Sequence, residues 1–248
     1  MKNMKKVIRN TLLFMAGWAV AMIIFSLTHK VTDLQYLLQI FLIPATVLGL
    51  IGFLSAIFAN KNPQPKKMLS IWLLIAGIAV DQAIKIYLFA QNWQEMNIPI
   101  IEPVFYLNPS QNTLGSYLWV LLGLKNTSHL LNIILFIIIG TLFTELYRFY
   151  VQYKGNSFWI KGAFHLFLIG LLANIIDNAV HGGSLDYLSI NPFYITDLKD
   201  IFITLGELYL LIEVIDQKLW KSDKGFEKSF NGFIKKDFKR LFEKNKKS

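Results

Sequence analysis

Acids and amides gather in one stretch near residue 180 of the chain. They are Asn174, Asp177, Asp186, Asp197 and Asp200. Two close carboxylates cannot both ionise easily, so one keeps its proton while the other stays charged. The charged partner can take a proton from water that attacks a peptide carbonyl, and the protonated partner can polarise that carbonyl. The group therefore indicates acid/base chemistry, which needs neither a metal nor a cofactor. Helix capping is the alternative role for Asp197 and Asp200, because a helix N-terminus favours carboxylates.

A second pair of charges lies inside an apolar segment. Asp81 and Lys85 are four residues apart, so they share one helix face and can neutralise each other. Charged side chains are costly inside a membrane, where they mark either a function or a pair buried between helices. Both roles stay open for this pair.

Composition defines the setting in which these groups act. Of the 248 residues, 54% are hydrophobic and 17% are charged, and there is no cysteine. Soluble domains have roughly 45–50% apolar residues and about a quarter charged residues, so we expect a membrane protein. The absence of cysteine excludes disulfides, zinc ribbons, iron–sulfur clusters and thiol nucleophiles.

The net charge of +9 does not point to nucleic acid. Residues 218–248 hold 11 Lys and Arg against 4 Asp and Glu, so most of the excess belongs to a tail. Its phenylalanines alternate with lysines in a spacing that favours a basic amphipathic helix on an anionic membrane leaflet. A flexible solvated tail is the alternative.

The elements that must position the acids are membrane helices. A helix needs roughly 20 apolar residues to cross the hydrocarbon layer. Six stretches meet this length, near residues 8–28, 34–59, 69–91, 129–150, 158–178 and 200–217. We expect six spans, with no long water-soluble domain between them.

Cations near the ends of the spans predict the orientation, because Lys and Arg collect on the cytoplasmic side. They are Lys2, Lys5, Lys6 and Arg9, then Lys61, Lys66 and Lys67, then Arg148, Lys154 and Lys161, and finally the tail. With six spans, all of these fall on one side, so both termini are expected in the cytoplasm. Segments 92–128 and 179–199 would then face outward, together with the acids.

The sequence resembles lipoprotein signal peptidase, the type II signal peptidase of bacteria. That family of four-helix membrane aspartic proteases carries an Asp and a Lys four residues apart in its first span, as do Asp81 and Lys85. Its first external segment has an Asn five residues after a Leu and then a Gly. Here Leu107 is followed by Asn112 and by Gly115, which stands one place later than usual.

The family's GNxxDR and GxxxD[FY] motifs match the stretch of acids. Ala173, Asn174, Asp177 and Asn178 stand at the positions of the first motif, and Asp186 follows Asp177 at the family's nine-residue step. Asn178 replaces the family's Arg, whose planar set of donors suits the holding of polar groups. Ala173 replaces a Gly.

The family's NxAD motif, followed six residues later by a Gly, fits this chain in two ways. One register pairs Asp200 with Gly206 without a gap and places Asp197 at the family's Asn. In the other register, residues 193–197 match FNxAD, so that Asp197 becomes catalytic. We favour Asp200. In that register Lys199 replaces a small residue, and a cation there favours two charged carboxylates, which weakens a dyad that must share a proton.

The resemblance covers about residues 69–217 and implies an all-α polytopic membrane protein. Its parts would be a four-helix core at 69–217, a small external β-cradle supplied by about 92–128, two additional N-terminal helices with a basic loop at 1–68, and the tail at 218–248. The location implied is the cell membrane of a bacterium, with the active site on the outer side.

The resemblance also implies an activity. A membrane aspartic endopeptidase of this family cuts diacylglyceryl-modified prolipoproteins on the amino side of the lipidated cysteine. Asp186 and Asp200 would be catalytic. The residues that orient the dyad, the substrate or the helices would be Asp81, Lys85, Asn112, Gly115, Asn174, Asp177 and Asn178. No metal, cofactor or nucleic acid is expected, membrane lipids and lipidated substrates are the expected partners, and the oligomeric state is undetermined.

Two alternatives stay open. The first is a family member that keeps the fold without peptidase activity and binds lipidated proteins or another partner. The second is a small ion- or proton-coupled transporter with Asp81, Lys85, Asp177 and Glu207 as its relay.

Overall fold

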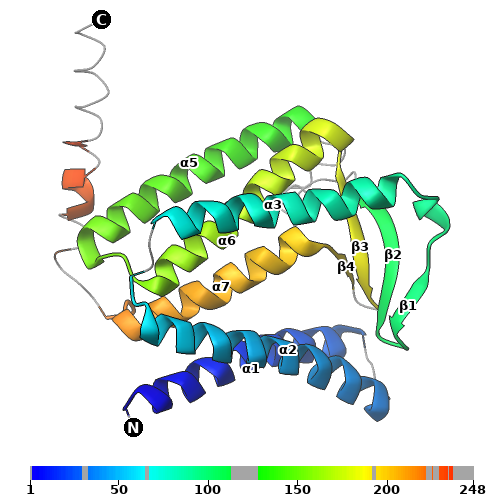
Figure 1. Cartoon of the computed structure of the whole chain (residues 1–248), viewed down its shortest axis with the longest axis horizontal. Coiled ribbons are helices and arrows are strands. Elements are labelled where there is room, and N and C mark those ends of the chain that lie inside the picture. The colour runs from blue at the N-terminus through cyan, green and yellow to red at the C-terminus, as the bar shows by residue number, and fades with distance from the viewer. Residues whose placement is uncertain are drawn as a thin grey trace, which may run out of the picture.

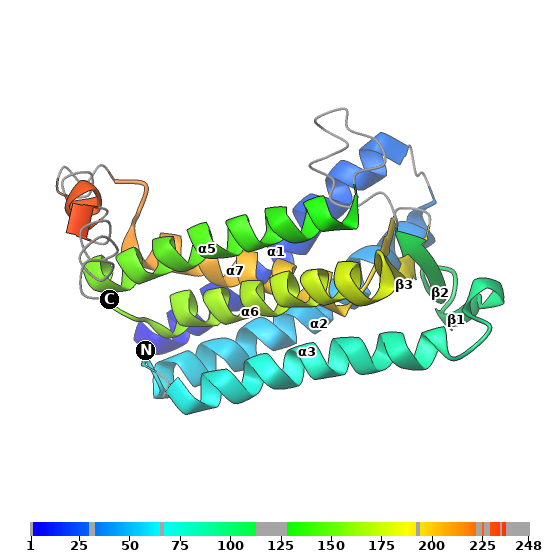
Figure 2. The same ribbon diagram turned by 90° about the horizontal axis from the view of Figure 1, so that it is seen from above.

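Six long helices run back and forth along one bundle, with a small sheet at one end (Figures 1 and 2). The computed structural model describes residues 2–29, 33–64, 67–112, 128–191, 194–221, 225, 229–233 and 235–236. The helices are α1 (Lys2–His29), α2 (Leu34–Lys61), α3 (Lys67–Phe89), α5 (His129–Lys154), α6 (Phe158–Ile176) and α7 (Leu198–Gln217). Each of them overlaps one of the six predicted stretches.

Four helices begin at a polar residue whose side chain caps the first turn. Asp33 accepts a hydrogen bond from a backbone N–H at the start of α2, and Ser128 and Ser157 do the same for α5 and α6. Asp197 caps α7 by accepting from the Asp200 N–H at 3.1 Å. Such caps satisfy N–H groups that the helix leaves unpaired, so these helices begin where a capping residue meets an apolar run.

Five of the six helices qualify as membrane spans by length and composition, and α7 does not. The expectation of six apolar spans is therefore not met, although α7 runs beside α6 along the bundle (Figure 1). The charges that disqualify α7 include two with partners on neighbouring elements. Near its far end, Glu213 accepts hydrogen bonds from Tyr150 and Ser157, and Asp216 pairs with Arg9 at 2.6 Å.

A four-stranded antiparallel sheet covers the end of the bundle where α7 begins (Figure 1). Its strands lie in the order β1 (Ile98–Ile101), β2 (Phe105–Asn112), β3 (Ser184–Ile190) and β4 (Tyr194–Thr196). Only β1 and β2 come from the segment at 92–128, which also contains the 3₁₀ turn η1 (Trp93–Glu95). The predicted cradle exists, but half of it comes from the second external segment.

Helix α6 ends in a turn of π-helix, η2 (Asp177–His181), before the chain enters β3. Gly182 follows with φ +67°, a left-handed conformation that glycine adopts without strain. A π-helical turn widens the helix locally, and such turns occur frequently at functional sites. This one carries Asp177 and Asn178, both buried.

The two N-terminal helices form a hairpin that packs on α7. Phe14 on α1 is fully buried in a cluster that includes Leu208 and Ile212 of α7. The hairpin is itself tight, because a Cβ at Gly52 on α2 would lie 2.7 Å from the Phe14 ring. The hairpin is thus packed into the same core as the helices that carry the acids.

Candidate active site

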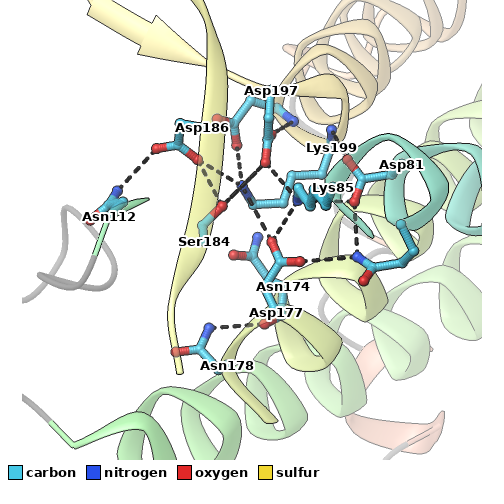
Figure 3. A network of polar contacts seen from close by, with 12 residues as sticks. Asp81, Lys85, Asn112, Asn174, Asp177, Asn178, Ser184, Asp186, Asp197 and Lys199 are labelled. Carbon is cyan, nitrogen blue, oxygen red and sulfur yellow. Dashed lines mark hydrogen bonds and ion pairs between the residues drawn. The ribbon is translucent and has the colours of Figure 1, made fainter. Parts of the chain in front are cut away.

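Five carboxylates from four parts of the chain converge between the sheet and the helix ends. Asp81 comes from α3, Asp177 from η2, Asp186 from β3, and Asp197 and Asp200 from the start of α7. Two ammonium groups, Lys85 and Lys199, lie among them (Figure 3). The sequence pointed to these acids and to both cations, but not to the number of carboxylates that each cation contacts.

Lys85 holds the deeper half of the cluster together. Its side chain is fully buried, and its Nζ lies 3.0 Å from Asp81, 2.6 Å from Asp177 and 2.8 Å from Asp197. Gln82 adds hydrogen bonds of 3.0 Å to both Asp81 and Asp177. One cation thus ties α3, η2 and the start of α7 into a fixed arrangement. Removing either partner of such a buried pair leaves an uncompensated charge, which is strongly destabilising.

Lys199 occupies the half of the cluster nearer the sheet. Its buried Nζ donates to Ser184 Oγ at 2.6 Å and to Asp186 Oδ1 at 3.3 Å, and it also contacts Asp197. Asp200 Oδ1 lies 3.9 Å away. The side chain therefore points into the cluster, so the cation faces the acids predicted to be catalytic.

Asp197 is held in its ionised form by two neighbouring cations. Burial alone would raise the pKa of its carboxyl, but the charges of Lys199 and Lys85 outweigh burial and hold this pKa below its usual range. The side chain is fully buried, and it also caps α7. Its hydrogen-bonding capacity is thus committed to neighbours within the fold.

Asp186 and Asp200 are less enclosed than Asp197. Asp186 accepts hydrogen bonds from Ser184 Oγ at 2.7 Å and from Asn112 Nδ2 at 3.3 Å. Asp200 accepts one from Thr196 Oγ1 at 3.3 Å, and its side chain is 44% exposed, against 0% for Asp197. Of the two candidate partners for Asp186, only Asp200 has a carboxylate that an incoming substrate could reach.

The carboxylate oxygens of Asp186, Asp197 and Asp200 lie within 4.8 Å of one another. Three acids at this spacing form a donor set that could hold a metal ion. Here the Lys199 ammonium lies within 4 Å of all three. The ammonium of Lys199 thus supplies the positive charge among these three acids.

The two asparagines of the GNxxDR-like motif make hydrogen bonds within α6 and η2 and to α5. Asn174 Nδ2 donates to the Gly170 carbonyl at 3.2 Å, and Asn178 Nδ2 donates to the Asn174 carbonyl at 2.9 Å. Asn132 on α5 donates to Asn178 Oδ1 at 3.2 Å. Asn178, which replaces the family's Arg, thus joins α5 to η2. Gly115, the remaining predicted residue, lies outside the described residues.

The Asn132→Ala variant is expected to lose about 1–2 kcal/mol of stability. It removes the donor to the buried Asn178 carbonyl oxygen, and an unsatisfied buried acceptor carries its full desolvation cost. Thermal unfolding of the detergent-solubilised protein measures the loss. The exposed Asn191 provides the control Asn191→Ala, for which we expect a change within about 0.5 kcal/mol. Equal melting temperatures for the two variants would show that Asn178 does not depend on this contact.

Ser184, Thr196 and Gln82 belong to the cluster and were not anticipated. Ser184 is two residues before Asp186 on the same strand, so both side chains point to one face of the sheet. That alternation was the available signal for Ser184. Gln82 is adjacent to Asp81 and reaches Asp177 on another helix, a contact for which the sequence gives no signal.

Comparisons with known proteins identify the family of this chain. Residues 73–216 match the family of signal peptidase (SPase) II. The lipoprotein signal peptidase of Clostridioides difficile (strain 630) is 28% identical over 150 residues, which cover 60% of this chain and 95% of the relative. That of Halothermothrix orenii is 27% identical over 152 residues, covering 61% of this chain and 95% of the relative.

A solved bacterial membrane enzyme shares the fold. It superimposes with a TM-score of 0.51 and 20% sequence identity, over 65% of this chain and 96% of the enzyme. The four-helix core and its sheet thus have a known counterpart, whereas α1 and α2 precede the residues that match the family. The chain, a multi-pass membrane protein, belongs to the signal peptidase II family of aspartic peptidases.

Proposed function

We propose that this protein is an active endopeptidase that removes the signal peptide from diacylglyceryl-modified prolipoproteins, cutting on the amino side of the lipidated cysteine. The observation that carries the proposal is the proximity of Asp186 on β3 to the partly exposed Asp200 on α7. One oxygen of each lies within 4.8 Å of the other, close enough for the charge on one carboxylate to oppose ionisation of the second.

The proposed reaction uses these two acids on one water molecule. The ionised carboxylate takes a proton from water as its oxygen bonds to the scissile carbonyl carbon, and the protonated carboxyl donates a hydrogen bond to the carbonyl oxygen. The C–N bond then breaks, and the departing amine receives the proton. Ser184 and Asn112 hold Asp186 in place, and Thr196 holds Asp200.

The proposed placement in the membrane follows from the ends of the helices. The ends of α2 and α5 carry Lys61 and Lys154, and they lie opposite the sheet together with the start of α1 (Figure 1). A cation-rich end of a bundle favours the cytoplasm. This supports cytoplasmic termini and a site on the outer face of the cell membrane. The division into residues 1–68, 69–217 and 218–248 and the contact of the tail with membrane lipids are parts of the same proposal.

Lys199 favours a second candidate, a family member that binds lipidated proteins without cutting them. Its ammonium favours the ionised form of Asp200, whereas the reaction needs one carboxyl of the pair protonated. For the transporter alternative, Asp81, Lys85 and Asp177 form one buried ion cluster. This cluster satisfies its own charges, and no contact of the described residues links it to Glu207.

Expression in cells that lack their own lipoprotein signal peptidase tests the proposal. A lipidated precursor is followed on a gel, and we expect the shorter mature form to accumulate only when the wild-type chain is expressed. Good expression with no mature form would refute peptidase activity. If the uncut lipidated precursor then purifies with the chain, the binding function is supported instead.

A further inference from the structure

We propose that the N-terminal hairpin α1–α2 forms one wall of a cavity that receives an acyl chain of the lipidated substrate. The inference rests on the proposed function and assigns a role to the two helices that precede the residues matching the family. It makes the hairpin a determinant of substrate specificity in addition to a membrane anchor.

A cavity of about 720 Å³ lies between the hairpin and α7. Trp18 on α1 and Val47 on α2 line it on one side, and Ile201 and Leu208 of α7 line it on the other. Ile190 on β3 contributes from the sheet. Without α1 and α2, this face of α7 would be open to the bilayer, so the hairpin adds a second wall beside an otherwise exposed helix face.

The cavity is continuous with the candidate active site. Asp200 and its hydrogen-bond partner Thr196 belong to its wall. A group that occupies the cavity therefore lies next to the peptide bond that is cut beside Asp200. In a diacylglyceryl-modified substrate, the acyl chains are joined to the cysteine that follows the scissile bond.

The lining of the cavity suits an acyl chain. Most of the side chains that line it are apolar, including Trp18, Ile43 and Leu208. A hydrocarbon chain needs only such apolar walls. Thr204 lies four residues after Asp200, on the same side of α7, and its hydroxyl can donate a hydrogen bond to the esters that link the chains to glycerol.

Occupancy by the substrate, and not by a lipid of the bilayer, follows from the position of Asp200. A bilayer lipid would place its headgroup at the membrane boundary, where it would compete with the peptide for the space beside the two acids. A chain carried by the substrate fills the cavity and brings the scissile bond to the acids in the same binding event.

The test fills the cavity from the hairpin side. Val47 and Val20 are exposed to similar extents, 53% and 57%, and only Val47 lines the cavity. Val47→Trp and Val20→Trp therefore make the same change in the same kind of surroundings. Each variant, in lipid nanodiscs, is given a signal peptide whose cysteine carries two palmitoyl chains, or the same peptide with two acetyl groups.

We expect Val47→Trp to raise KM for the dipalmitoyl peptide about tenfold, which corresponds to excluding roughly two methylene groups from the cavity. The value for the diacetyl peptide should not change, kcat should stay constant, and Val20→Trp should behave as wild type. Equal KM values of Val47→Trp and Val20→Trp for the dipalmitoyl peptide would overturn the inference while leaving the peptidase in place.

A binding measurement keeps the inference testable if no peptide is cut. A dipalmitoyl peptide with a diazirine at mid-chain should cross-link to α1 or α2, and less so in Val47→Trp. Such cross-links without cleavage would support the cavity and refute the peptidase. Cross-links only to residues outside the cavity lining, or none, would refute the cavity. Phosphatidylglycerol that carries a diazirine tests the other occupant. If it labels the same residues and the peptide does not reduce this labelling, the cavity binds bilayer lipid and the assignment is overturned.

Discussion

Cleavage of a lipidated precursor is expected to fall by about a thousandfold or more in Asp186→Asn and in Asp200→Asn. An amide cannot accept the proton of the attacking water, and it cannot share a proton with a second carboxylate. Asn keeps the size of Asp, so the hydrogen bonds from Asn112 and Thr196 retain an acceptor oxygen. Single-turnover cleavage by the purified protein measures the loss.

Asp197→Asn is the matched control for these two variants. Asn also caps helices well, so α7 should still begin at this residue. The variant loses a charge that faces Lys85 and Lys199, so we expect a lower melting temperature with measurable cleavage. If a folded Asp197→Asn were inactive while Asp200→Asn still cut, Asp197 would be the partner of Asp186.

Lys199→Met is expected to lower stability by about 3 kcal/mol and to extend cleavage to higher pH. Methionine keeps most of the length of the side chain without its charge. Asp186 then loses a cation at 3.3 Å, and Asp200 loses one at 3.9 Å. Without that cation the pair keeps its shared proton at a higher pH. The alkaline limb of the pH–rate profile should therefore move upward by about one pH unit.

The control for Lys199→Met is Lys199→Arg, which keeps the charge and should keep the alkaline limb in place. Thermal unfolding and cleavage between pH 5 and 9 measure the two effects separately. An unchanged limb in a folded Lys199→Met would show that Lys199 does not influence the proton shared by the pair. A downward shift would contradict the proposed role of that proton.

The helices of this fold were readable from the sequence because apolar length and capping residues are local signals. Stretch 34–59 became α2, Leu34–Lys61, with its N-terminal cap at Asp33. The sixth stretch met the length criterion, but its charges exclude it as an apolar span. Their compensation by Arg9, Tyr150 and Ser157 depends on contacts between residues far apart in the chain, which no local pattern predicts.

The candidate site was predictable in its acids and not in its arrangement. Helical spacing put Asp81 beside Lys85, and the structure brings them within 3.0 Å. The same spacing gave no indication that Asp177 and Asp197 share Lys85, because they reach it from other elements. Lys199 was recognised as a cation beside Asp200. Its place in the sequence allowed the side chain to point toward the acids or away to the membrane surface. The fold directs it inward.

The partners of the α7 charges also bear on how the protein enters the membrane. An ionised residue adds to the cost of inserting an isolated helix, by roughly 2.5–3.5 kcal/mol at the centre of the helix and by less toward its ends. Helix α7 carries Glu213 and Asp216, whose partners belong to α1, α5 and the cap of α6, segments that are synthesised earlier. Helix α7 is therefore expected to insert poorly by itself and to need contacts with the earlier helices. Biogenesis would then proceed in sequence order, with the two acids meeting only after the rest of the bundle is in place.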